Sequence, residues 1–121
     1  MKTSSYTLLP TITFGTANDN YDGVSSSFSS DPVKAAAYYS KTKSLQTVSW
    51  YLSNLVAVVK FEATLDKDPD TSNYFPILVL GDGVNPLSEN NFQNIEGNYT
   101  WIRVTIEQFT AGVIEKISIG Y

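Results

Sequence analysis

The sequence predicts an all-β fold: a single antiparallel β-sandwich, jelly-roll-like, with an extended N-terminal arm. Three observations predict it. Apolar and polar residues alternate in several short segments, clusters of Gly, Pro, Asn and Asp separate those segments, and no segment carries a convincing apolar stripe of helical spacing. The 121 residues suffice for one domain with two packed layers. We therefore divide the chain into an arm and edge strand over 1–31 and a β-sandwich domain over 32–121.

The N-terminal segment, 1–31, is rich in Ser and Thr and includes a serine-rich run at 25–30. Residues 6–14 alternate well enough for a strand, which Pro10 restricts to a sheet edge or a bulge. A segment of this composition becomes ordered only when other residues supply contacts. Two interpretations are open: an arm that docks on a neighbouring subunit, or a frayed terminus followed by a long loop.

A helix is the competing prediction for residues 31–40. Asp31 at the N-cap, Pro32 at the first helical position and the alanines at 35–37 are all helix start signals. The segment is short, however, two tyrosines follow the alanines, and there is no amphipathic stripe. We therefore expect it to be extended.

The clearest strand signals lie between residues 45 and 65. Alternation over 45–51 predicts one strand, Ser53-Asn54 predicts a turn, and 55–65 predicts a second strand. The second strand has one continuous apolar face, and its other face turns polar towards the end. The apolar face consists of Leu55, Ala57, Val59, Phe61, Ala63 and Leu65.

The rest of the chain predicts an edge strand, a connection and a hairpin. Residues 74–80 form a short apolar strand, in which Pro76 again indicates an edge or a bulge. Residues 81–98 predict a long connection rich in Gly and Asn. Strands over 100–108 and 113–121 close the chain, and 109–112 predicts the hairpin turn between them.

Composition excludes several functional classes. The chain has no Cys and no His, with 12 acidic and 8 basic residues. Disulfide frameworks, thiolate nucleophiles, zinc fingers, imidazole bases and Ser-His-Asp triads are therefore excluded. The few basic residues are scattered, no apolar run is long enough for a bilayer, and no secretory signal is evident. We expect no enzyme, no cofactor, no direct nucleic-acid contact and no membrane contact.

Three aspartates form a weak candidate for a metal site. Asp66, Asp68 and Asp70 have the one-three-five spacing of a calcium loop. The rest of that template is missing, because Thr71 stands where the loop needs Gly and Ile77 where it needs the bidentate Glu. The sequence favours a turn between two strands, in which Asp side chains cap backbone amides.

The other carboxylates predict structural pairing. Glu62 and Glu107 stand near Lys60 and Arg103 on strand positions that face solvent. We expect cross-strand ion pairs from these residues rather than the opposed carboxylates of a glycosidase.

Aromatic residues are the second notable feature, with 8 Tyr, 6 Phe and 2 Trp. Adjacent strand residues point to opposite faces, so one ring of each adjacent pair is left at the surface or in an interface. Part of the excess is ordinary core. The interface candidates are Tyr38, Tyr39, Trp50 and Trp101, because Tyr and Trp are enriched in contact patches. Such rings next to Asn or Asp are also suited to stacking on sugars.

Three blocks of sequence, taken in order, carry a family resemblance. They are PVKAAAYYS with LQTVS (32–40, 45–49), FEATLD with YFPI (61–66, 74–77), and GNYTWIRV with FTAGVI (97–104, 109–114). Together they resemble small β-sandwich structural proteins of tailed phages, especially marine contractile-tailed phages and cyanophages. The resemblance covers 32–121. The chain departs from it at Ala37 and Ser40, where that family usually has Gly.

The resemblance implies a non-enzymatic component of the virion and supplies no active-site residues. The expected function is capsid decoration or cementing, or another head, neck or tail role, by adhesion to neighbouring subunits. The expected partners are the major capsid, neck or tail protein, with homo-oligomer formation. The alternative is a carbohydrate-binding module of a fibre tip or host-surface adhesin.

Overall fold

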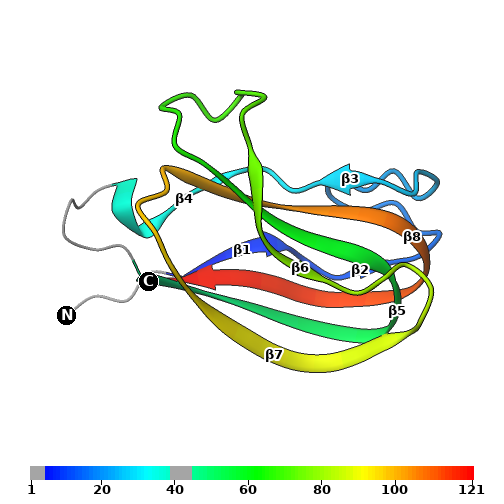
Figure 1. The fold of residues 1–121 in the computed structure, drawn as a ribbon. Coiled ribbons are helices and arrows are strands. Elements are labelled where there is room, and N and C mark those ends of the chain that lie inside the picture. Colours follow the sequence, from blue (N-terminus) through cyan, green and yellow to red (C-terminus); the bar gives the residue numbers. More distant parts are fainter. Residues whose placement is uncertain (1–4, 39–44) are drawn as a thin grey trace.

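In a computed structural model, which describes residues 5–38 and 45–121, the chain forms an antiparallel β-sheet folded into two layers (Figure 1). Two strands of 20 residues dominate it, β5 (Leu45–Thr64) and β8 (Trp101–Gly120). They pair with each other over nearly their whole length, and both bend near the middle, so each contributes to both layers. The all-β antiparallel class predicted from the sequence is confirmed.

The first layer is centred on the start of β5 and the end of β8. Residues 113–120 of β8 pair with residues 47–53 of β5. β1 (Ser5–Leu9) and β2 (Ile12–Thr13) flank β8, and β7 (Leu87–Glu96) flanks β5. The layer therefore runs from β1 through β8 and β5 to β7.

The second layer is built from the other halves of the same two strands. Residues 101–111 of β8 pair with residues 56–64 of β5. β3 (Phe28–Ser29) and β4 (Val33–Lys34) flank β8, and β6 (Phe75–Leu80) flanks β5. Along the chain, β1 and β2 belong to the first layer, β3 and β4 to the second, β6 to the second and β7 to the first.

Two predicted turns are bends within continuous strands. Ser53-Asn54 lies inside β5, where Asn54 has a φ of 49° and the pairing register with β8 shifts. The predicted hairpin at 109–112 is wrong, because both parts of β8 pair with β5 rather than with each other. The turn-forming residues redirect each strand into the other layer without ending it.

The core lies between the layers and comes mainly from alternate residues of β5 and β8. The apolar face predicted over 55–65 is buried up to Ala63, whereas Leu65 follows the end of β5 and is 62% exposed. Gln46 is the main buried polar side chain, and its amide joins two segments: Oε1 accepts from the Ala36 N–H (3.2 Å) and Nε2 donates to the Ile95 carbonyl (2.7 Å).

The described part of the N-terminal segment is integrated into the sandwich. Leu9 and Ile12 are fully buried, and the Tyr21 ring packs 5.1 Å from the Phe109 ring. Pro10 lies between β1 and β2, which form an edge of the sheet, as the sequence predicted. Residues 5–31 thus pack on β8 of their own chain and complete its core, rather than extending as a separate arm.

Two further predictions need correction. The connection predicted over 81–98 contains the ten-residue strand β7. Its side chains are mostly exposed and polar because it lies at an edge, so the apolar alternation of a buried strand is missing. Residues 31–38, expected to be extended, contain β4 followed by a short 3-10 helix, η1 (Ala36–Tyr38).

Candidate interaction surface

The outer face of the β6 layer carries a network of ion pairs, here called the charged face: Lys60, Glu62, Arg103, Thr105 and Glu107. Lys60 Nζ lies 2.6 Å from Glu107 Oε1. Arg103 Nε donates to Glu62 Oε1 at 2.9 Å, and the Thr105 hydroxyl donates to the same oxygen at 2.6 Å. The predicted cross-strand pairing is confirmed, and these carboxylates are bound to neighbouring side chains.

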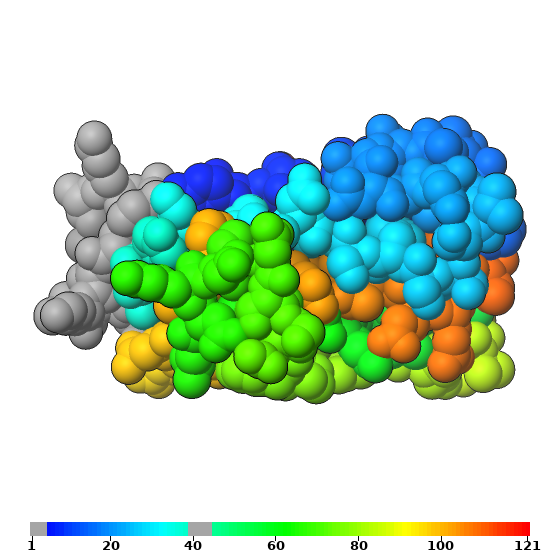
Figure 2. All heavy atoms as spheres, turned by 90° about the horizontal axis from the view of Figure 1, so that it is seen from above, coloured from blue at the N-terminus to red at the C-terminus, as the bar shows by residue number. Residues whose placement is uncertain are grey.

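A loop of the same chain covers part of the charged face. The Arg103 guanidinium carbon lies 4.0 Å from the centre of the Tyr74 ring, and the Tyr74 hydroxyl donates to the Pro69 carbonyl at 2.9 Å. Burial raises the pKa of Tyr74 above its ordinary value. Figure 2 shows this loop (green) lying over β8 (orange). The charged face is therefore largely occupied by the chain's own side chains.

Two of the three candidate calcium ligands, Asp66 and Asp68, hold that loop together through their carboxylates. Asp66 Oδ2 accepts hydrogen bonds from the Thr71 hydroxyl and from Asn73 Nδ2 (2.9 Å), and these donors, Thr71 first, lower the pKa of Asp66. Asp68 Oδ1 accepts from the Asp70 N–H at 2.9 Å. Within the described residues, no three His, Cys, Asp or Glu side chains are grouped so as to hold a metal ion. The arrangement is that of a capped turn.

Of the interface candidates, Trp50 is misassigned. It is 3% exposed, points into the core and lies 5.8 Å from the Phe61 ring. Its indole Nε1 donates to Glu89 Oε1 at 2.9 Å, which links β5 to β7. The outward ring of that adjacent pair is Tyr51, which is 38% exposed. Adjacent strand residues do alternate between faces, but the sequence does not say which of the two points inward.

Tyr38 and Trp101 lie together at one end of the sandwich, and Tyr39 is outside the described residues. The Tyr38 and Trp101 rings meet edge to face, with centroids 5.3 Å apart and planes at 64°. Lys34 Nζ lies 4.7 Å from the centre of the Tyr38 ring, and the Trp101 indole donates to the Lys67 carbonyl at 3.1 Å. The two rings are not coplanar, so they do not form a flat stacking platform.

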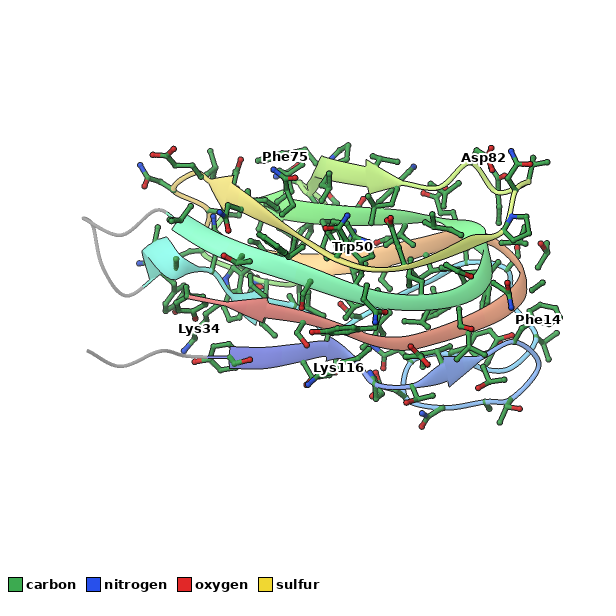
Figure 3. The ribbon with its side chains drawn as sticks, turned by 90° about the horizontal axis from the view of Figure 1, so that it is seen from below. Phe14, Lys34, Trp50, Phe75, Asp82 and Lys116 are labelled. Carbon is green, nitrogen blue, oxygen red and sulfur yellow. The ribbon has the colours of Figure 1, made fainter. Side chains whose placement is uncertain are left out.

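Among the described residues, no segment covers the opposite outer face, on the layer of β1, β8, β5 and β7. Figure 3 shows these strands side by side with no described loop crossing them. Register and burial place small polar side chains and two aromatic rings on this side. We call it the open face, and its residues are Thr7, Thr47, Ser49, Tyr51, Asn90, Phe92, Asn94 and Ser118.

The open face has little charge across its centre. Charged side chains lie at the two ends of this face: Lys116 is opposite Tyr51 at one end, and Glu96 is opposite Leu45 at the other. Thr47 Oγ1 donates to Asn94 Oδ1 at 2.7 Å, which ties β5 to β7. The remaining positions present hydroxyl, amide and ring surface. Such a face suits contacts made by hydrogen bonds and ring burial rather than by long-range charge.

One row of the open face crosses the whole layer. Thr7, Ser118, Ser49 and Phe92 lie opposite one another in turn, on β1, β8, β5 and β7. Ser118 is only 8% exposed, and within the described residues its hydroxyl has no hydrogen-bond partner. No motif in the sequence marks these residues. Alternation over 45–51 indicates a polar face, but the pairing of β5 with β7 and β8, and of β8 with β1, joins segments that are distant in the sequence.

Comparison with known proteins finds no family model that matches the chain and no curated protein that matches it significantly. No helix among the described residues is long and apolar enough to cross a membrane.

Proposed function

We propose that the chain is a non-enzymatic structural protein of a phage virion, which acts by adhesion of its open face to neighbouring virion subunits. The open face is the observation that carries this proposal. It spans β1, β8, β5 and β7 and presents Tyr51 and Phe92 among hydroxyl and amide groups. Contact patches between proteins are depleted in charge and enriched in aromatic rings, as this face is.

The virion context and the absence of catalysis have separate support. The resemblance of residues 32–121 to small structural proteins of tailed phages supports a location on the virion. The partner would be the major capsid, neck or tail protein, with capsid decoration as the leading role. Engagement of Glu62 with Arg103, and of Glu107 with Lys60, supports structural rather than acid/base roles for these carboxylates.

The test is incorporation into particles produced from a genome that encodes this chain. Immunogold labelling should detect the wild-type protein on purified particles. Ser49→Lys places a charge at the centre of the open face and should abolish incorporation. Val58→Lys, on the opposite outer face next to Glu107, is the matched control and should incorporate normally. Unlabelled wild-type particles, or full occupancy by Ser49→Lys, would contradict the proposal.

A carbohydrate-binding module is the second candidate, and one observation favours it. Tyr51 and Phe92 project from the open face on neighbouring strands, with Asn90 directly opposite Tyr51. Rings next to amide groups suit sugar recognition. A glycan array would then show saturable binding that Tyr51→Ala abolishes and Tyr38→Ala, on a ring away from this face, preserves. A flat response of the wild-type protein would exclude this candidate.

A further inference from the structure

The outer edge of β7 lacks a partner strand among the described residues, and side chains of β7 itself bond two of its backbone groups: Asn91 Oδ1 accepts from the Phe92 N–H (2.8 Å), and Gln93 Nε2 donates to the Asn94 carbonyl (3.2 Å). One side of β7 pairs with β5, and within the described residues no strand pairs with the other side. An edge strand presents a row of backbone N–H and C=O groups that can pair with another chain. We propose that β7 pairs in antiparallel fashion with β7 of a second copy of this chain, about a two-fold axis.

The other edges of the sandwich carry features that oppose strand pairing, and the edge of β7 does not. β6 has six residues, contains Pro76 and shifts register against β5. β1 and β2 are interrupted near Pro10, with a register shift in β1, and β3 and β4 have two residues each. Proline, bulges and shortness are the usual devices that prevent edge pairing. All of these edges carry at least one of them.

β7 lacks those devices. It has ten residues, contains no Pro, Lys or Arg, and keeps an unbroken register with β5 from Glu89 to Glu96. Between these two glutamates the strand carries no charge. A long, regular edge without charge at its centre is the kind that pairs with another strand.

β7 is also complementary to a second copy of itself. With Phe92 opposite Phe92 of the second copy, Asn90 faces Asn94, and Ser88 faces Glu96. Glu89 faces Ile95, so no two glutamates lie opposite each other, which would be unfavourable. The two Phe92 rings meet across the axis. Phe92 is 61% exposed, the most exposed of the exposed aromatic side chains, and pairing would cover it.

Such pairing joins two copies through a continuous layer. Residues directly opposite each other in an antiparallel pair point to the same side of the sheet, so Phe92 opposite Phe92 places the two open faces on the same side. This inference rests on the edge of β7 and does not depend on the virion assignment. The pair leaves most of each open face accessible and presents two of them together. A particle partner would then engage both copies, which raises its effective affinity.

Light scattering of the purified full chain over a concentration series tests the inference. The wild-type protein should approach twice 13.4 kDa. Phe92→Lys should have the mass of one chain, because two like charges would meet at the axis. Asn94→Lys should also have the mass of one chain, because a lysine on an edge strand opposes pairing with another strand. Val79→Lys, at a 50% exposed position on the β6 edge, is the matched control and should keep the double mass. Thermal unfolding verifies that all variants fold.

Hydrogen exchange gives an independent readout, since amides of β7 that face away from β5 should become protected as the concentration rises. Several outcomes would overturn the inference: a wild-type mass of one chain at every concentration, a mass other than that of two chains, or a double mass retained by Phe92→Lys. Loss of the double mass in Val79→Lys as well would place the interface elsewhere.

Discussion

Gly112 lies so close to Asn54 that a Cβ at position 112 would overlap the Asn54 carbonyl oxygen. Gly112 also has a φ of +96°, a backbone conformation that residues with side chains rarely adopt. The contact joins β8 to β5 where both strands pass from one layer to the other. The folding of one sheet into two layers therefore depends on the absence of a side chain at this position.

Gly112→Ala is expected to destabilise the fold by roughly 2–5 kcal/mol, because it combines backbone strain with a clash against backbone atoms that cannot rotate away. Gly15→Ala is the matched control. Gly15 also has a positive φ, +88°, but a Cβ there would meet no heavy atom within 4 Å. Its expected cost is about 1 kcal/mol. Urea unfolding measures both, and equal costs would show that the Asn54 contact is unimportant.

The core of β5 was predictable from the sequence, whereas the path of the chain was not. Alternation over 55–65 identifies an inward face because a half-buried strand has a period of two residues. Asn54 and Gly112 are turn-forming residues, and residues of these types occur both in hairpin turns and in bends within a continuous strand. The outcome is decided by pairing between β5 and β8, which are distant in the sequence.

The open face could not be predicted from the sequence for a related reason. Thr47 and Ser49 look like ordinary solvent-facing positions until β8 and β7 are placed beside them. β7 itself carries the polar residues Asn91 and Gln93 on its inward side, which is tolerated because an edge strand stays partly solvated. Polar composition therefore suggested a loop where the chain forms a strand.

The role of the N-terminal segment can be tested with a single side chain. Leu9 is fully buried between the layers, so Leu9→Ala should lower the free energy of unfolding by about 2–5 kcal/mol. Thr7→Ala, two residues earlier on the exposed side of β1, should change it by less than about 0.5 kcal/mol. Chemical denaturation gives both values. If the segment served only as a docking arm, Leu9→Ala would be as mild as Thr7→Ala.

The two ion pairs of the charged face should differ in strength. The Glu62 side chain is 15% exposed and accepts hydrogen bonds from both Arg103 and Thr105. Glu62→Ala should cost about 1–3 kcal/mol, because it leaves those donors without their acceptor. Lys60→Ala removes a pair whose side chains are 33% and 37% exposed, and should cost about 0–1 kcal/mol.

Urea unfolding at low and high salt distinguishes the two pairs of the charged face. The Lys60 effect should shrink as salt increases, because water and ions screen an exposed pair, whereas the Glu62 effect should persist. If Glu62→Ala and Lys60→Ala lowered the free energy of unfolding equally at low salt, the hydrogen bonds to Glu62 would contribute nothing beyond the ion pair.

Asp22 provides a pH-dependent contribution to stability. The Ser25 hydroxyl donates to Asp22 Oδ2, and the Ser25 and Val24 N–H groups donate to Oδ1. These bonds, the Ser25 hydroxyl first, lower the pKa of Asp22 from 3.8 to about 2. A folded-state pKa below the unfolded value means that the contribution is present above pH 3.8 and is lost as the pH falls through about 2.

The melting temperature of the wild-type protein should fall between pH 3.8 and about 2, and Asp22 should account for part of that fall. Asp22→Asn should remove this part. Ser25→Ala should act more selectively, because it removes the hydroxyl donor and keeps the backbone donors. The pKa of Asp22 should then move back towards 3.8 without reaching it. Titration of the Asp22 carboxyl carbon by NMR measures this directly. A wild-type carboxyl that titrates near 3.8 in the folded protein would show that the Ser25 contacts do not form in solution.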